Sequence, residues 1–84
     1  MNNKHTKTLE AINTSPTLAN IRFSDIESLL IALGADCAEG NGSRVRFLLN
    51  GLEWYAHRPH PGKEAKRYQV ESVREFLHKL GITQ

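Results

Sequence analysis

The dipeptide Asn50-Gly51 constrains the fold of this 84-residue chain more than any other part of its sequence. Asn-Gly is the preferred pair for a two-residue type I′ hairpin turn, because both central residues of that turn have a positive φ. Before it, the apolar residues Val45, Phe47 and Leu49 recur at every second position as they do in a strand, and the run LEWYAH follows it. The sequence therefore predicts an antiparallel hairpin over residues 44–57.

A helix is predicted before the hairpin, beginning at Ser24. Ser24 and Glu27 have the spacing of a capping box, in which two side chains satisfy backbone groups at the helix N-terminus. Gly34 stands where a glycine often ends a helix. Between these signals lies an apolar stripe with helical spacing, made of Ile26, Leu29, Leu30 and Leu33.

A second helix and a third strand complete the predicted domain. The closing helix starts at about Gln69 and ends at Gly81, and its apolar face consists of Val70, Val73, Phe76, Leu77 and Leu80. The turn sequence Gly40-Asn41-Gly42 would fold the short segment 35–39 back onto the hairpin as a strand. The order helix, three antiparallel strands, helix predicts an α+β domain with both helices on one face of the sheet and the other face open.

Residues 1–20 are assigned to a short N-terminal helix or arm, and residues 21–84 to the domain. Leu9 and Ile12 have helical spacing, and Ser15-Pro16 ends that pattern. No apolar run is long enough to span a bilayer, and the N-terminus lacks the apolar core of a signal peptide. A cytoplasmic protein without a membrane partner is therefore expected.

The single cysteine, Cys37, cannot form an internal disulfide. It has no second thiol with which to build a zinc site. We expect it to be a small, partly buried residue.

The positive charge of the chain is concentrated in its second half. Residues 1–42 carry three cations and five acids, whereas residues 43–84 carry eight cations and four acids. Alternation along the strand places Arg44 and Arg46 on the face opposite Val45. Such an excess of cations suits a partner that carries phosphates, because cations that neutralise phosphates release counterions. A solvated surface without a partner is the alternative.

The stretch HRPHPGKE, residues 57–64, is a stiff loop that carries charge. Proline removes a backbone donor and favours extended geometry in the residue before it, which holds Arg58 and His60 extended. With Lys66 and Arg67 just beyond it, the segment presents two histidines and four cations against a single acid. Ordered loops of this kind often carry binding and catalytic residues.

From about Ser24 to Ile82, these segments together resemble the HicA family of bacterial toxins. The resemblance rests on the helix DIESLLIALGA, the Gly42-Ser43 start of the second strand, the Asn50-Gly51 hairpin, the run HPGKE and the closing helix VESVREFLHKLGI. It implies a fold like that of a double-stranded-RNA-binding domain (dsRBD-like), with the N-terminal helix or arm as an addition. It also implies an endoribonuclease that cleaves messenger RNA, and a HicB-like antitoxin protein that neutralises it.

The chain departs from this family at one functional position. The family's second strand usually begins Gly-Ser-His, with the catalytic histidine of the ribonuclease, whereas this chain has Gly42-Ser43-Arg44. Arginine stays protonated near neutral pH and cannot act as a general base. It can still stabilise the charge that develops on the phosphate when the neighbouring 2′-hydroxyl attacks. The proton transfers are then assigned to His57 and His60.

Metal-free RNA cleavage needs a general base, a general acid and positive charge near the phosphate. Histidine suits both proton transfers, because its unperturbed pKa of about 6.5 lets both forms be populated near neutral pH. We therefore predict that the catalytic residues are His57, His60 and Arg44. The predicted RNA-binding residues are Ser43, Arg46, Arg58, Lys63, Lys66 and Arg67.

Several other interpretations stay open. His57 and His60 offer two metal ligands, but no cysteine or carboxylate at a familiar spacing supplies a third, so no metal or cofactor is predicted. A serine nucleophile at Ser43 lacks an adjacent base or an elbow motif. The histidines could also serve only to order the turn and end the strand. Without cleavage activity the same fold would be an RNA-binding module, and a purely protein-binding adaptor would bind no RNA.

Overall fold

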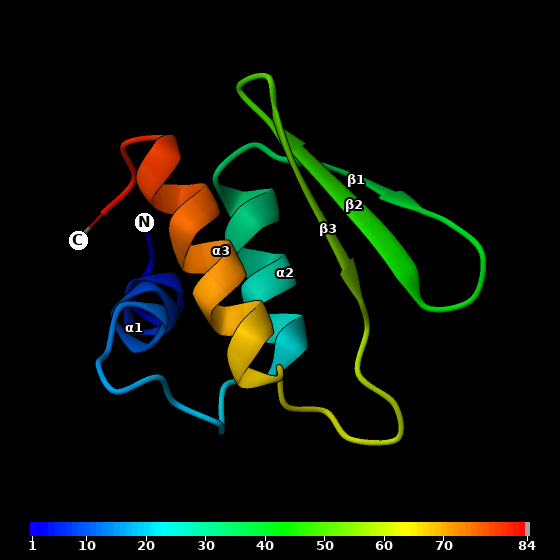
Figure 1. Cartoon of the computed structure of the whole chain (residues 1–84). Coiled ribbons are helices and arrows are strands. Elements are labelled where there is room, and N and C mark those ends of the chain that lie inside the picture. The colour runs from blue at the N-terminus through cyan, green and yellow to red at the C-terminus, as the bar shows by residue number, and fades with distance from the viewer. Residues whose placement is uncertain (84) are drawn as a thin grey trace.

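The computed structural model describes residues 1–83. Its elements, in chain order, are α1 (Asn3–Ile12), α2 (Phe23–Ala32), β1 (Asp36–Glu39), β2 (Arg44–Leu49), β3 (Leu52–His57) and α3 (Arg67–Lys79). Helices α2 and α3 lie side by side between α1 and the antiparallel sheet, so the molecule has three layers (Figure 1). This arrangement confirms the predicted α+β, dsRBD-like order of helix, three-stranded sheet and helix, with an additional N-terminal helix.

The β2–β3 hairpin has the register that its turn sequence predicts. Asn50 and Gly51 have φ values of 50° and 84°, the positive values that a type I′ turn requires. Leu49 faces Leu52 beside the turn, and Arg44 faces His57 at the far end of the ladder. Strand β1 pairs with the other side of β2, so β1 and β3 are the two edge strands.

Helix α2 begins one residue earlier than predicted and without the capping box. Its first residue is Phe23, and no side chain caps the helix at the preceding residue, Arg22. Ser24 therefore lies inside the first turn, and the predicted box with Glu27 is wrong. The reason is that the Phe23 N–H donates to the Lys63 carbonyl at 2.9 Å, so that the loop before α3 satisfies one of the free donors at this helix end.

Glycines end α2 and α3 as predicted. Gly34 and Gly81 have φ values of 104° and 75°, which are accessible to glycine at little cost. The residues after them close the helix ends: the Ala35 N–H donates to the Leu30 carbonyl and the Ile82 N–H donates to the Leu77 carbonyl, both at 2.9 Å. This is the hydrogen-bond pattern of a Schellman motif.

The core runs from the inner face of the sheet through α2 and α3 to α1. Its largest fully buried side chains are Ile12, Ile26, Leu29, Leu30, Val45, Phe47, Val70, Val73 and Leu77. Trp54 connects the sheet to the helices, because its ring is stacked on Phe23 at a centroid distance of 6.0 Å and on Phe47 at 5.7 Å. Its indole Nε1–H donates to the Ser72 hydroxyl on α3 at 2.9 Å.

The N-terminal segment is a helix that packs into this core, rather than a free arm. Leu9 and Ile12 are buried among the residues of α2 and α3. Arg74 on α3 donates from Nε to the Ile12 carbonyl at 2.8 Å and from Nη2 to the Thr14 carbonyl at 3.2 Å. These bonds hold the end of α1 against α3. No helix within residues 1–83 is both long and apolar enough to span a membrane.

Candidate functional site

Arg44 and His57 face each other across the hairpin. The Arg58 N–H donates to the Ser43 carbonyl at 2.8 Å, and hydrogen-bonded and non-hydrogen-bonded pairs alternate along an antiparallel ladder. Arg44 and His57 are the next pair and are therefore non-hydrogen-bonded, the kind of pair in which side chains lie closest. Both side chains are exposed on the face of the sheet away from α2 and α3. The structure thus brings together two of the three predicted catalytic residues.

The loop 58–66 lies at the same end of the molecule as this pair. It runs beside the segment before α2, where the Ala65 N–H donates to the Ile21 carbonyl at 2.7 Å. As a result, the N-termini of α2 and α3 and the end of β3 lie at one end of the molecule (Figure 1). Helix N-termini carry the positive end of the helix dipole, which adds to the positive field there.

Four of the predicted residues in and just after this loop are exposed, but they do not all lie together. His60, Lys66 and Arg67 line a shallow depression of about 570 Å³. Lys63 lines a separate depression of about 250 Å³ beside the N-terminus of α2. Within residues 1–83, no hydrogen bond joins His60 to Arg44 or His57.

Arg58 is held by two carboxylates. Its Nε donates to both oxygens of Glu27 at 3.0 Å, and its Nη1 donates to Glu39 Oε1 at 3.0 Å. These hydrogen bonds, first to Glu27 and then to Glu39, raise the pKa of Arg58 further above its ordinary value. The guanidinium thus joins the end of β3 to α2 and β1, and the two carboxylates compensate its charge.

Gln69 is a residue near the site that sequence reasoning identified only as a helix start. It is 4% exposed, its Oε1 accepts from the Lys66 N–H at 2.9 Å, and its Nε2 donates to the His57 carbonyl at 2.8 Å. The first bond caps α3, which explains why this helix begins at Arg67, two residues earlier than predicted. The second bond fixes the backbone of His57 relative to α3. The glutamine lies at the third helical position, as in a capping box, but the N-cap residue is Lys66 instead of the usual Ser or Thr, so the pattern could not be recognised in the sequence.

Three side chains form a polar network farther along the open face of the sheet. Arg46 Nη1 donates to Glu53 Oε2 at 2.9 Å, and the Tyr55 hydroxyl donates to Glu53 Oε1 at 3.1 Å. Arg46 and Tyr55 face each other in the register. Tyr55 was not among the predicted site residues, although its alternation with the core residue Trp54 indicates that it lies on the open face.

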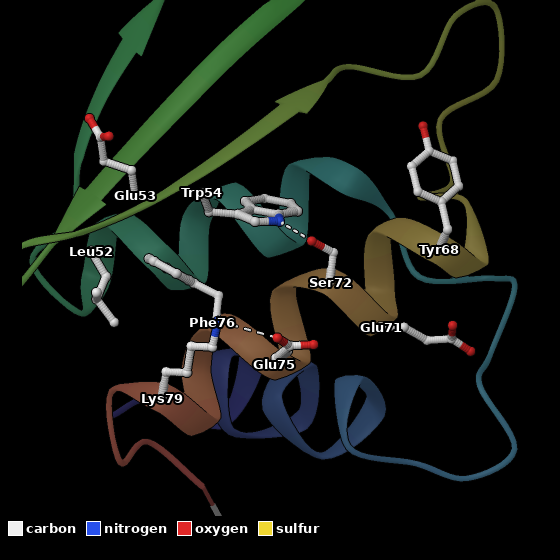
Figure 2. A pocket seen from close by; sticks show the side chains of 9 residues that line it. All are labelled: Leu52, Glu53, Trp54, Tyr68, Glu71, Ser72, Glu75, Phe76 and Lys79. Atoms are coloured by element: carbon white, nitrogen blue, oxygen red, sulfur yellow. Dashed lines mark hydrogen bonds and ion pairs between the residues drawn. The ribbon is translucent and has the colours of Figure 1, made fainter.

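None of the predicted site residues lines the groove between β3 and α3, although Glu53 in its wall binds Arg46, and Tyr68 also lines the depression of His60, Lys66 and Arg67. Figure 2 shows Leu52, Glu53 and Trp54 on its β3 side, and Tyr68, Glu71, Ser72, Glu75, Phe76 and Lys79 on its α3 side. It has a volume of about 350 Å³. Its three glutamates outnumber its single lysine, which makes it unsuited to a phosphate-bearing ligand.

Metal-ligating and nucleophilic groups are sparse in the described part of the chain. Within residues 1–83, no three His, Cys, Asp or Glu side chains are grouped so as to hold a metal ion. The Ser43 carbonyl takes part in the strand ladder by accepting from the Arg58 N–H.

Cys37 is exposed rather than partly buried as predicted, because it lies on the edge strand β1, whose four residues are all exposed. Desolvation and then the Glu27 carboxylate raise the pKa of its thiol.

Comparison with known proteins identifies a protein family. Residues 23–82 match the model of the family described as "HicA toxin of bacterial toxin-antitoxin". No curated protein and no solved structure matches the chain significantly. The matched range includes α2, all three strands and α3, and it leaves out α1. The chain therefore belongs to the HicA family, the toxins of bacterial toxin–antitoxin systems, whose partner is an antitoxin.

Proposed function

We propose that the protein is a cytoplasmic toxin that binds messenger RNA and cleaves it without a metal, and that a HicB-like antitoxin inhibits it. The observation that carries this proposal is the pairing of Arg44 with His57 on the open face of the sheet. A cation and a group that can transfer protons are therefore neighbours on one face of the sheet. This is the minimum that attack of a ribose hydroxyl on its own phosphate requires.

The chemistry assigned to the pair follows from the two side chains. His57, when neutral, accepts the proton of the 2′-hydroxyl, and the freed oxygen attacks the adjacent phosphorus. Arg44 donates to the phosphate oxygens, whose negative charge increases as the fifth bond forms. The bond from phosphorus to the 5′-oxygen then breaks, and this oxygen takes a proton from the general acid. We assign this role to His60, the other histidine at the same end of the molecule. The products are a 2′,3′-cyclic phosphate and a 5′-hydroxyl.

The proposed phosphate-binding surface extends from this pair along the open face of the sheet and over the loop 58–66 at the same end of the molecule. It consists of the half-buried Ser43 and the exposed cations Lys63, Lys66 and Arg67, together with Arg46, whose charge is partly compensated because its Nη1 donates to Glu53. Arg58 is left out of this set, because its donors are directed to Glu27 and Glu39. We assign to Arg58 the structural task of fixing the strand end that carries His57.

Induced expression in a bacterial host tests this proposal. Growth should stop and transcripts should be shortened, and co-expression of a HicB-like protein encoded beside the gene should restore growth. A host that grows normally, with intact transcripts and confirmed soluble protein, would overturn the proposed ribonuclease activity.

A second candidate function is an RNA-binding module without cleavage activity. It is favoured by one observation, the presence of Arg44 where the family's usual Gly-Ser-His motif has its histidine. In that case purified protein would bind RNA to saturation and leave it intact. A protein-binding adaptor would show no salt-sensitive affinity for RNA at all.

The cations of the loop before α3 give a separate prediction about affinity. Replacing Lys63 and Lys66 with alanine should weaken RNA binding and reduce the slope of log affinity against log salt by about 0.7 for each lost contact with single-stranded RNA. Titrations at several salt concentrations measure this slope. A Lys7 and Lys79 double alanine variant is the matched control, since it removes the same charge from α1 and from the opposite end of α3. Equal slopes in both variants would exclude Lys63 and Lys66 from the RNA-binding surface.

A further inference from the structure

We propose that Tyr55 stacks on a base of the substrate and thereby restricts cleavage to unpaired RNA. This inference rests on the proposed function, because it concerns the same face of the sheet. Its first support is exposure: the Tyr55 side chain is 66% exposed, although its neighbours in the strand include the buried Trp54. Within residues 1–83 its ring is not stacked on another aromatic ring, so that a planar ligand has access to it.

The Tyr55 ring is held at both ends. The rigid ladder of β3 fixes its Cα, and the hydrogen bond from its hydroxyl to Glu53 at 3.1 Å fixes the far end of the ring. Glu53 is itself held by Arg46 at 2.9 Å, and this ion pair also compensates a carboxylate that would otherwise repel RNA. A ring fixed before binding loses little conformational entropy when a base stacks on it.

The spacing along β3 relates Tyr55 to the proposed cleavage site. Tyr55 and His57 point to the same face and are two residues apart, which corresponds to about 6–7 Å along a strand. This is comparable to the length of one nucleotide in an extended RNA chain. Their partners across the hairpin, Arg46 and Arg44, repeat the same step. A base stacked on Tyr55 would therefore leave an adjoining phosphate between Arg44 and His57.

Stacking at this position selects single-stranded RNA for a physical reason. A base inside a duplex is already covered on both sides by its neighbours, whereas an unpaired base has a face available for an aromatic side chain. Proteins that bind single strands combine such aromatic residues with cations along the backbone path, as Tyr55 is combined here with Arg44 and Arg46. A duplex would reach only the cations.

An exposed apolar residue on another surface provides the control. Ile31 is 55% exposed and lies on α2, which packs against the opposite face of the sheet (Figure 1). The second exposed tyrosine, Tyr68, is unsuitable, because it lines both the acidic groove of Figure 2 and the depression that contains His60, Lys66 and Arg67. Replacing Ile31 removes an exposed apolar side chain from a place where no base is expected to stack.

The test compares the affinity of variants for two RNA probes. The first is a short fluorescein-labelled single strand of mixed sequence, 2′-O-methylated to prevent cleavage, and the second is the same strand annealed to its complement. Tyr55→Ala should weaken binding of the single strand about 5- to 150-fold, the loss that corresponds to the usual energy of stacking one base. Its affinity for the duplex should change little. Tyr55→Phe, which keeps the ring but loses its bond to Glu53, should lose much less affinity than Tyr55→Ala, and Ile31→Ala should bind the single strand like the unmodified protein.

The outcomes separate this inference from the proposed function. If the unmodified protein binds the single strand and Tyr55→Ala binds it equally well, the stacking role is overturned and the proposed function stands. If the unmodified protein binds neither probe, both are overturned. Tyr55→Leu keeps an apolar side chain suited to a strand, so it tests the role of the ring even if the alanine variant is unstable. Single-strand affinity that is retained in Tyr55→Leu would also overturn the stacking role.

Discussion

Replacing His57 with alanine is expected to slow RNA cleavage about 10²–10⁴-fold, the usual effect of losing a positioned proton-transfer group. RNA affinity should change little, because a neutral imidazole contributes little to the attraction of phosphates. Single-turnover cleavage of a labelled RNA measures the rate, and a titration of the same preparation measures the affinity. The fold should persist, since the His57 side chain is exposed and Gln69 binds only its backbone carbonyl.

Variants of the neighbouring residues show whether the loss is specific to His57. Arg44→Ala should also slow cleavage, because it removes the cation that stabilises the negative charge developing on the phosphate. A His57 and His60 double alanine variant that cleaves RNA at the original rate would disprove a histidine-based mechanism.

Replacing Trp54 with alanine is expected to lower the free energy of unfolding by about 3–5 kcal/mol. The substitution removes a buried ring that is stacked on both Phe23 and Phe47, and it leaves a cavity between the sheet and the helices. For a domain whose total stability is roughly 5–15 kcal/mol, this is a large fraction. Urea denaturation followed by circular dichroism measures the change, because Trp54 is the chain's only tryptophan and fluorescence is lost with it.

Two milder substitutions divide this effect into its parts. Ser72→Ala removes only the acceptor of the indole N–H and should cost about 0.5–1.5 kcal/mol, or more if the buried donor finds no water. Trp54→Phe keeps an aromatic ring in the core and should lie between Ser72→Ala and Trp54→Ala. Unfolding of Trp54→Ala at the same urea concentration as the unmodified protein would show that this ring does not hold the helices on the sheet.

The fold could be predicted from short-range signals in the sequence. The Asn50-Gly51 turn determines the hairpin register, and Gly34 and Gly81 mark where helices end, because each signal acts on backbone atoms only a few residues away. The start of α2 could not be predicted in the same way. It depends on the Lys63 carbonyl, which is 40 residues along the chain from its partner Phe23 and reaches it only in the folded protein.

The difference between local and long-range signals also explains which parts of the candidate site could be predicted from the sequence. Counting along the strands from the Asn50-Gly51 turn places Arg44 opposite His57, so this pair follows directly from the sequence. The partners of Arg58 could not be found by counting. Its charge and its place next to His57 agree with a phosphate ligand, but tertiary packing places two carboxylates, Glu27 from α2 and Glu39 from β1, beside its guanidinium. The sequence shows how many charges a segment carries, but not which of them neutralise each other in the folded protein.

The register of the β2–β3 hairpin has a consequence for which length changes this chain can tolerate. A residue inserted at Asn50-Gly51 would require either a wider, bulged turn or a shift of β3 against β2 by one position, which would turn each of its side chains to the other face of the sheet. In the shifted register Arg44 and His57 would no longer face each other, and Trp54 would leave the core. The connection at Gly40-Asn41, by contrast, lies before the Gly42-Ser43 motif and affects mainly how β1 joins the sheet. Insertions and deletions among related sequences should therefore accumulate there, while the length of the hairpin turn stays fixed.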